Sequence, residues 1–507
     1  MTRARQRWTL VATILGSAMT FIDGTVVNVA LPALQTDLQA TITDVQWVVA
    51  SYSLFLSALL LLGGSLGDQF GRKRVFLIGV GVFTGASVLC GLASSPRLLI
   101  GARALQGVGA AFLVPGSLAI INATFDGAER GRAIGTWSGF SAITTAIGPV
   151  LGGWLIERIS WRAAFFLNVP LAAAVIVLSV AFMNESKDSS RGKGIDWIGG
   201  ALAVLGLGGL SLGLIEWPAL GARHPMVVAS LLLGVTMLVA LVIVEGRGQS
   251  PMMPLKVFRS RAFSLANALT LLLYAALGMV MFLVPLVLIQ VQHYTATQAG
   301  AAIVPFAVIM FAGSRWAGGL IGRVGPRLPL TIGPAVAAVG IAMFAMTRVG
   351  GSYWSAVFPA VCLMGAGMTI TVAPLTTTVM GAVETAQSGV ASGINNAVSR
   401  VAGLLAIAVF GVLLASSFNA RIQPRLSELR LPAAARQQVE RELPKMAGAE
   451  LRSTEMSETQ RRVVQKRLDQ AFVEAFRIVM LGCAALALAA AGFGAAIRQP
   501  ARRARAT

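Results

Sequence analysis

Residues 64–74 read Gly64-Ser-Leu-Gly67-Asp68-Gln-Phe-Gly71-Arg72-Lys73-Arg74 and close a long apolar stretch. The first ten positions align without gaps to Gly318-Gly-Leu-Ile-Gly322-Arg-Val-Gly325-Pro-Arg327. Both copies end an apolar segment and lead into a short basic connection. Paired halves of this kind are typical of secondary transporters. The repeat therefore predicts two related bundles of six helices each.

The composition of the chain indicates a membrane protein independently of the repeat. The 507 residues are 56% hydrophobic and only 12% charged, and the mean hydropathy is +0.74. A soluble chain of this length cannot hide so much apolar surface from water. The net charge of +20 does not indicate nucleic acid, because the cations lie in short connections and form no continuous stripe. We expect an all-α polytopic protein in contact with the lipid bilayer, with no nucleic-acid partner.

Apolar segments of about 20 residues can cross the hydrocarbon core of a bilayer. About fourteen are expected, near residues 9–33, 45–67, 75–94, 98–122, 132–156, 162–183, 195–217, 225–245, 262–290, 298–321, 328–347, 354–378, 387–416 and 472–497. The repeat assigns residues 1–183 to an N-terminal six-helix bundle and residues 251–507 to a C-terminal one. Residues 184–250 are then an insertion of two transmembrane helices.

Lysine and arginine concentrate in alternate connections, as in Arg3-Ala-Arg5-Gln-Arg7 and Arg72-Lys73-Arg74. The positive-inside rule places these connections in the cytoplasm. Both termini are then cytoplasmic, in a multi-pass protein of the cell (inner or plasma) membrane. The connection 417–471 must be external although it is rich in arginine, which is the main conflict in this topology. Within it, Gln437–Leu443 and Thr459–Phe472 are predicted to form amphipathic helices on the outer surface.

Two charged residues fall inside predicted spans. Asp23 lies within the first apolar stretch, where a carboxylate costs about 2.5–3.5 kcal/mol and usually faces a water-filled cavity or an ion pathway. The alternative is a misplaced helix boundary, with Asp23 as a surface N-cap. Arg103 lies at least one turn inside the fourth span and needs a partner, for which Asp23 is a candidate; snorkelling to the interface is the alternative. The repeat aligns these two positions near the apolar Leu277 and Val361, so coupling chemistry is expected only in the N-terminal half.

Several motifs resemble those of the major facilitator superfamily. Residues 64–74 resemble its motif A, Leu99-Ile-Gly-Ala-Arg103-Ala-Leu-Gln-Gly107-Val-Gly109 its motif B, and Gly148-Pro149-Val-Leu-Gly152-Gly153 its motif C, which is associated with antiporters. Asp23-Gly-Thr-Val-Val-Asn28-Val-Ala-Leu-Pro32 and Trp161-Arg-Ala-Ala-Phe-Phe-Leu-Asn168-Val-Pro170 are similar to signatures of the fourteen-helix drug:proton antiporters. The resemblance covers almost the whole chain. It implies the major-facilitator fold, the proton gradient as energy source and no cofactor.

Motif A combines small residues with charges at the cytoplasmic rim. Gly64, Gly67 and Gly71 allow helices to approach closely. Asp68, with Arg72 and with Arg130 as a plausible partner, is expected to form a latch that holds the outward-open state and breaks on the inward swing. The alternative is that the basic residues of the motif only fix the orientation of the chain.

Motif C places Gly148, Gly152 and Gly153 on one helix with Pro149 between them. Such glycines form a smooth helix face, and the proline bends the helix. The motif is expected to form a tight but movable seal between the halves. General packing of small residues is the alternative.

A substrate pocket is expected at the centre, between the two halves. The candidate lining residues are Phe21, Trp47, Tyr52, Trp137, Tyr274, Phe282, Phe306, Asn395 and Arg400. For the polar run that contains Asn395 and Arg400, interhelical hydrogen bonding is the alternative. Few acids accompany these residues, which favours lipophilic or amphipathic substrates over multiply charged cations.

The function predicted from these features is proton-coupled efflux of small molecules by alternating access. The nearest alternative is export of a native metabolite, amino acid or lipid on the same fold. A membrane receptor or enzyme is a further alternative, but no nucleophile–base pair or metal-ligand spacing supports an enzyme or a metal site. No Gly-x-x-x-x-Gly-Lys-Ser/Thr loop for ATP is present in the sequence. Whether a periplasmic adaptor takes part is open.

Overall fold

Long helices make up the computed structural model, which describes residues 2–187, 194–248, 251–383, 388–429, 431–451 and 456–497. The first half holds α1 (Arg3–Asp37), α2 (Ile42–Phe70), α3 (Arg72–Gly91), α4 (Pro96–Thr124), α5 (Gly127–Arg158), α6 (Trp161–Phe166) and α7 (Asn168–Phe182). Two helices follow, α8 (Trp197–Leu220) and α9 (Pro225–Arg247). The rest of the chain holds α10 (Arg261–Gln290), α11 (Ala296–Gly318), α12 (Leu320–Val324), α13 (Arg327–Met343), α14 (Phe358–Gly381), α15 (Ser388–Ser427), α16 (Ala433–Glu442) and α17 (Glu458–Ala496).

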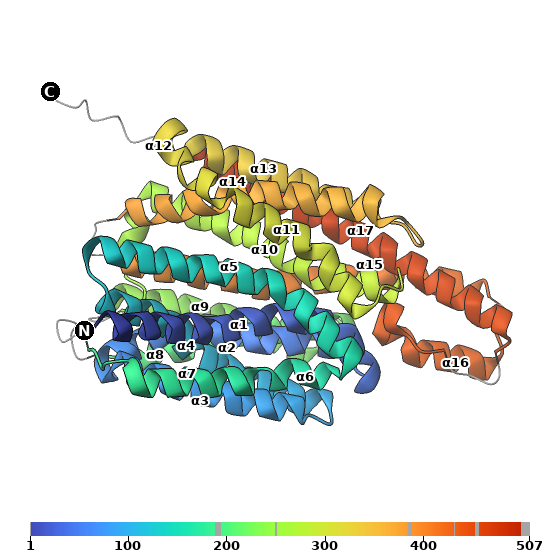
Figure 1. Ribbon diagram of the computed structural model, residues 1–507. Helices are drawn as coiled ribbons and strands as arrows, with labels where there is room; N and C mark the ends of the chain where they lie inside the picture. The colour runs from blue at the N-terminus through green and yellow to red at the C-terminus, as the bar shows by residue number, and fades with distance from the viewer. Residues whose placement is uncertain are drawn as a thin grey trace.

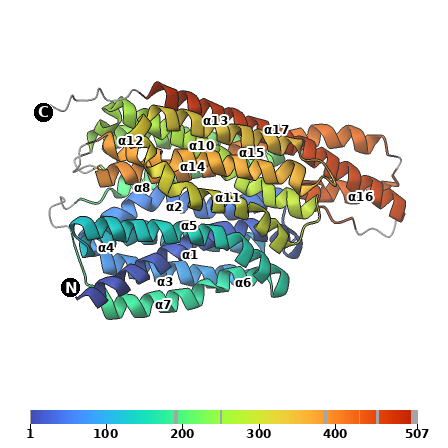
Figure 2. The same ribbon diagram turned by 45° about the horizontal axis from the view of Figure 1, so that its top comes forward.

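Thirteen helical segments of this described part are long and apolar enough to cross a membrane. They match thirteen of the fourteen expected spans. The remaining expected span, 132–156, lies within α5, whose 32 residues rise about 48 Å. That length also exceeds the roughly 30 Å of a hydrocarbon core. In Figures 1 and 2, α5 runs along the bundle beside α1.

Both copies of the repeat contain, at their eighth position, a glycine with an unusual backbone conformation. Gly71 separates α2 from α3 at φ +116°, and Gly325 separates α12 from α13 at φ +73°. Residues with a Cβ rarely adopt these angles. The chain therefore turns at the same position of each copy, into a helix that begins at Arg72 or Arg327.

The helices pack in two groups with the α8–α9 pair at their side. Helices α1 to α7 contact one another, as do α10 to α17. Helix α8 packs against α9, against α2 of the first group and against α15 of the second. The first group meets the second mainly through α5 with α11 and α2 with α15. Helix α1 begins and α17 ends at the same end of the bundle (Figures 1 and 2).

The connection 417–471 is mostly helical. Helix α15 continues to Ser427 and α17 begins at Glu458, so the last two expected spans are both longer than the sequence predicted. Arg425 Nη2 bonds to Glu474 Oε1 at 2.8 Å and joins these extensions. The expected helix 437–443 is α16, which begins four residues earlier, and the expected helix 459–472 is the first part of α17.

This extended region also contacts the first group of helices. The 3₁₀ turn Leu443–Gly448 follows α16. Its Lys445 donates to Gln39 Oε1 at 2.6 Å, and the Lys445 carbonyl accepts from Gln35 Nε2 at 3.1 Å. The turn therefore lies against the end of α1, at the opposite end of the bundle from the start of that helix.

Candidate functional site

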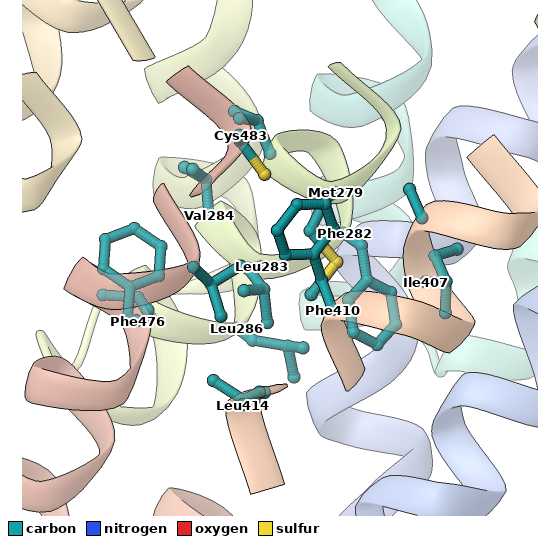
Figure 3. Packing of buried hydrophobic residues seen from close by; sticks show 14 of the residues in the cluster. Met279, Phe282, Leu283, Val284, Leu286, Ile407, Phe410, Leu414, Phe476 and Cys483 are labelled. Carbon is teal, nitrogen blue, oxygen red and sulfur yellow. The ribbon is translucent and has the colours of Figure 1, made fainter. Parts of the chain in front are cut away.

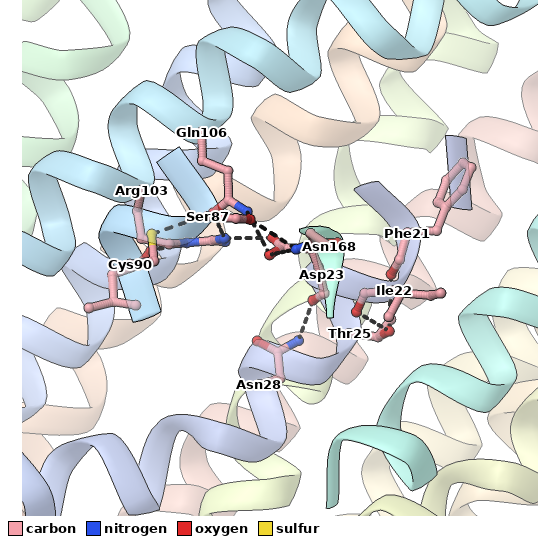
Figure 4. A network of polar contacts seen from close by, with 12 residues as sticks. Phe21, Ile22, Asp23, Thr25, Asn28, Ser87, Cys90, Arg103, Gln106 and Asn168 are labelled. Carbon is pink, nitrogen blue, oxygen red and sulfur yellow. Dashed lines mark hydrogen bonds and ion pairs between the residues drawn. The ribbon is translucent and has the colours of Figure 1, made fainter. Parts of the chain in front are cut away.

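Asp23 and Arg103 form a buried ion pair at the centre of the first group of helices (Figure 4). Asp23 lies midway along the continuous helix α1, and Arg103 lies in the second turn of α4. Arg103 Nη1 is 2.5 Å from Asp23 Oδ2, and each side chain is 1% exposed. Neither alternative from the sequence holds, because Asp23 is not a surface N-cap and Arg103 does not reach the interface. The predicted pairing of the two charges is present.

Three neutral polar residues complete this network, and sequence reasoning did not select them. Gln106 Nε2 donates to Asp23 Oδ1 at 2.8 Å and lies 2.7 Å from Ser87 Oγ. Asn168 Nδ2 donates to Ser87 Oγ at 2.9 Å and approaches Asp23 Oδ1 at 3.5 Å. The carboxylate thus receives donors from α4 and α7 while it belongs to α1 (Figure 4). The spacing of Gln106 three residues after Arg103 places both on one helix face and is the signal that was available.

Arg103 has further partners besides the carboxylate. Its Nε donates to the Val48 carbonyl at 3.2 Å, and its Nη1 to Gln106 Oε1 at 2.6 Å. The guanidinium carbon lies 4.1 Å from the centre of the Tyr52 ring, a cation–π contact. The close approach of α2 depends on Gly107, where a Cβ would lie 2.4 Å from the Tyr52 carbonyl oxygen. Arg103 therefore has acceptors to hold it if the carboxylate loses its charge.

Of the two arginines expected beside Asp68, Arg72 pairs with it and Arg130 does not. Asp68 Oδ1 binds Arg72 Nη2 of the same motif at 2.9 Å. Arg130, expected as its partner, instead donates to the Phe125 carbonyl at 3.0 Å and lies 3.4 Å from Asp126. The expectation for Arg130 is wrong because its own helix start offers nearer acceptors.

The glycines of motif A also have unequal roles. A Cβ at Gly63 would lie 2.2 Å from the Ala111 carbonyl of α4, whereas Gly64 and Gly67 would meet other atoms only at 3.6 and 3.9 Å. The tight contact between α2 and α4 is thus made one position before the predicted one. Gly64 and Gly67 make ordinary contacts, which corrects the expectation for these two residues.

Glu185 is a motif A partner that the sequence did not reveal. It lies after α7, and its carboxylate accepts from the Lys73 and Arg74 amides at 3.0 and 3.1 Å. These amides open α3, where an acid satisfies free donors and the helix dipole. A Cβ at Gly71 would lie 2.6 Å from the carboxyl carbon of Glu185. Glycine is therefore needed here both for its φ and for space.

The motif C helix lies between α1 and α11. A Cβ at Gly148 would clash with Thr25 Oγ1 and one at Gly152 with Val26, both on α1. On the other side, a Cβ at Gly153 would lie 2.5 Å from the Ala296 carbonyl, and one at Gly300 would lie 2.1 Å from the Pro149 carbonyl. At this point the two groups of helices thus meet backbone against backbone. At the end of α5, Thr297 Oγ1 also donates to Glu157 Oε2.

The aromatic candidates for the pocket are dispersed. Phe21 and Trp137 pack edge to face, with ring centres 6.4 Å apart, at the contact of α1 with α5. Trp47 donates to Glu216 Oε1 of α8 at 2.9 Å, so it joins α2 to the inserted pair. Phe282 is 1% exposed among Met279, Leu283 and Phe410 in the apolar core of the second group (Figure 3). Tyr274 and Phe306 pack against the same core. For Trp47 and Phe282 the structure gives packing roles in place of the expected cavity lining.

The two polar candidates on α15 differ from each other. Asn395 Nδ2 donates to Thr270 Oγ1 at 2.7 Å and to Asn267 Oδ1 at 3.1 Å, so it makes the interhelical bonds that the sequence left as an alternative. Arg400 is partly buried, and the described residues supply neither a hydrogen-bond acceptor nor a carboxylate for its guanidinium. The same described residues contain no group of three or more His, Cys, Asp or Glu that could hold a metal ion.

A bundle of apolar helices around a buried ion pair, with glycine contacts between two helix groups, defines a polytopic membrane protein of the transporter class. The model of the Major Facilitator Superfamily matches residues 13–407. The chain belongs to this superfamily, as the motifs predicted.

Relatives in the superfamily support this assignment. The chain is 36% identical to multidrug resistance protein Stp of Mycobacterium tuberculosis over 83% of its own length and 78% of that protein. It is 32% identical to the tetracenomycin C resistance and export protein of Streptomyces glaucescens, over 85% and 80%. Among solved structures, a bacterial homologue of the human lysosomal transporter Spinster, in an inward-facing and unoccupied conformation, superposes with a TM-score of 0.68. That match has 17% identity and covers 98% of this chain and 97% of the other, so it supports the fold alone.

Proposed function

We propose that this protein exports lipophilic or amphipathic small molecules across the cell membrane in exchange for protons. The observation that carries the proposal is the Asp23–Arg103 pair, at 2.5 Å and 1% exposure, in a chain of this superfamily. Ionisable groups this deep in a helical membrane protein mark ion and substrate pathways more often than packing. Relatives of the chain named for resistance and export point to drug-like cargo.

In this proposal Asp23 carries the proton. When it is ionised, the carboxylate holds α1 to α4 through Arg103 and Gln106. Protonation removes one charge of the pair and leaves Arg103 with the Val48 carbonyl, Gln106 and the Tyr52 ring. The free energy that couples α1 to α4 therefore depends on the proton.

The same helix α1 carries the contacts of motif C. Thr25 and Val26 lie two and three residues after Asp23 and meet Gly148 and Gly152 of α5. Helix α5 in turn meets α11 of the second group across Gly153. A shift of α1 on protonation is thus transmitted to the contact that closes the two groups against each other. We assign the motif C residues the role of a seal between the two groups. We assign Asp68 and Arg72, at the junction of α2 and α3, the role of a latch.

The proposal also includes an architecture and a topology. Residues 1–183 and 251–507 form the two moving bundles, residues 184–250 form the insertion, and both termini are cytoplasmic. The proton gradient supplies the energy without a resident cofactor or an enzymatic step. The basic end of α1 and the start of α3 then face the cytoplasm, and α16 faces outward.

Reconstituted transport tests the function. Purified protein in proteoliposomes should accumulate a lipophilic dye when a pH gradient is imposed, and a protonophore should abolish this accumulation. Asp23→Asn should lose pH-driven accumulation but keep dye exchange at equal pH on both sides, because only the proton carrier is removed. Asp37→Asn, which removes a half-exposed carboxylate of the same helix, is the matched control and should behave as wild type. pH-driven accumulation by Asp23→Asn at the wild-type rate would overturn the proposal.

A further inference from the structure

Arg400 is an unneutralised cation within a membrane span. It lies ten residues into the apolar segment Val390–Ser427 of α15, or about 15 Å along the helix. Arg103, also within a spanning helix, has a carboxylate at 2.5 Å, whereas nothing described in this structure pairs with Arg400. A guanidinium at this depth requires water or a ligand. Asn396, one turn earlier on the same face, is exposed, which is consistent with a polar path along this face.

The contacts of α15 direct this face toward α2 of the first group. Ala397 packs against the cluster that contains Tyr52 and Leu56, and Val401 packs against the cluster that contains Ala50 and Leu54. Arg400 lies between these two residues in sequence, about 60° around the helix from Ala397. It is thus at the junction of the two helix groups, at the level of Tyr52.

The Tyr52 hydroxyl is a second polar group without a partner. The side chain is 5% exposed, and its oxygen has no hydrogen-bond partner among the residues that the structure describes. Tyr52 lies within electrostatic range of Arg400, Arg103 and Asp23. A buried hydroxyl without a hydrogen-bond partner is unfavourable, so a ligand that bonds to it has a favourable place.

Together these groups form a site rich in donors and positive in charge. Arg400 offers five N–H donors and Tyr52 one O–H donor. With Asp23 ionised, the three charges Asp23, Arg103 and Arg400 sum to +1. Such a site attracts acceptor oxygens and repels cations.

We propose that Arg400 and the Tyr52 hydroxyl bind the acceptor oxygens of an amphipathic substrate, most strongly when they are anionic, and select against lipophilic cations. This inference rests on the proposed function and specifies its substrate class. The Tyr52 ring, stacked on Arg103, places this substrate site directly beside the proton site.

The test compares two dyes of opposite charge with purified protein and with proteoliposomes. Fluorescein, a carboxylate, and ethidium, a cation, are measured at one pH for binding affinity and for exchange. Because a hydrogen bond to a charged group contributes about 1.5–3 kcal/mol, Arg400→Gln should weaken fluorescein binding by about 10- to 150-fold. It should weaken ethidium binding by less than about twofold or strengthen it. Arg400→Lys should be intermediate, and Tyr52→Phe, which keeps the ring over Arg103, should weaken fluorescein binding by about 3- to 10-fold.

Arg477→Gln is the matched control, because Arg477 is also a partly buried arginine on a spanning helix, and among the described residues it bonds to the Thr347 carbonyl alone. It should leave the ratio of the two affinities unchanged, and thermal unfolding verifies that each variant is folded. An unchanged ratio in folded Arg400→Gln would overturn the inference, as would wild-type protein that binds ethidium more tightly than fluorescein. Either result would leave export intact. Wild-type protein that drives neither dye with a pH gradient would instead contradict the proposed function.

Discussion

A double-mutant cycle on Asp23 and Arg103 tests whether the buried pair acts as one unit. The variants are Asp23→Asn, Arg103→Gln and the combination of both. Two unit charges about 4 Å apart interact by about 4 kcal/mol at an effective dielectric constant of ~20, and removal of one member of a buried pair costs about 3–5 kcal/mol. We expect each single variant to lose about 3 kcal/mol of unfolding free energy. The double variant should lose less than their sum by at least about 2 kcal/mol, because neither charge is then left unpaired.

The assay is reversible unfolding of purified protein in mixed micelles, followed by circular dichroism. The pair Arg162–Asp37 supplies the matched control, since its atoms are equally close at 2.6 Å but its side chains are 35% and 47% exposed. Exposed pairs contribute about 0–1 kcal/mol, so the same cycle with Asp37→Asn and Arg162→Gln should show a small coupling energy. Additivity within about 0.5 kcal/mol at the buried pair would refute the view that the two charges depend on each other.

Three further substitutions follow from close contacts and capping. Gly153→Ala should lower cysteine cross-linking between the facing ends of α5 and α11, because its Cβ would lie 2.5 Å from a carbonyl of α11. Gly139→Ala, whose Cβ meets no atom within 4 Å, should leave it unchanged. Gly71→Ala should cost about 1–3 kcal/mol in thermal unfolding because of its φ of +116°, whereas Gly81→Ala in open space should not destabilise; equal melting temperatures would contradict this. Glu185→Gln should lose about 0.5–1 kcal/mol through weaker capping of α3, and a loss that persists at high salt would argue against a charge effect.

The sequence predicted those positions at which a residue is costly to place in a membrane-spanning helix. Asp23 and Arg103 were detectable because a charge in an apolar span needs a compensating partner. The turn glycine of the repeat was detectable because its position recurs in Gly325. Helix count and type followed from hydropathy, since every backbone group in a bilayer must bond within its own helix.

Other parts of the site depended on helix rotation and on contacts distant in sequence. Gln106 and Asn168 are neutral, so they stand out less than a charge in an apolar segment. Only the spacing from Arg103 marked Gln106, and only the fold brings Asn168 of α7 close to Asp23. Trp47 was assigned to the cavity because it is aromatic, but its partner Glu216 is 169 positions away in the inserted pair. Phe282 was assigned to the cavity for the same reason. The sequence pattern around an aromatic residue in a spanning helix is the same whether the side chain faces a core or a cavity.

The distribution of charge between the two helix groups bears on how a proton could drive the cycle. With Asp23 ionised, the charges of Asp23, Arg103 and Arg400 sum to +1; with Asp23 protonated, they sum to +2. Two cations in a closed apolar bundle cost more free energy than in a hydrated one, because desolvation penalises each charge. Under the proposed mechanism, protonation therefore favours the conformation in which water reaches this region. The backbone contacts of α5 with α11 oppose that opening. The free energy that protonation of Asp23 contributes must therefore exceed the free energy of the contacts at Gly153 and Gly300 before the two groups separate.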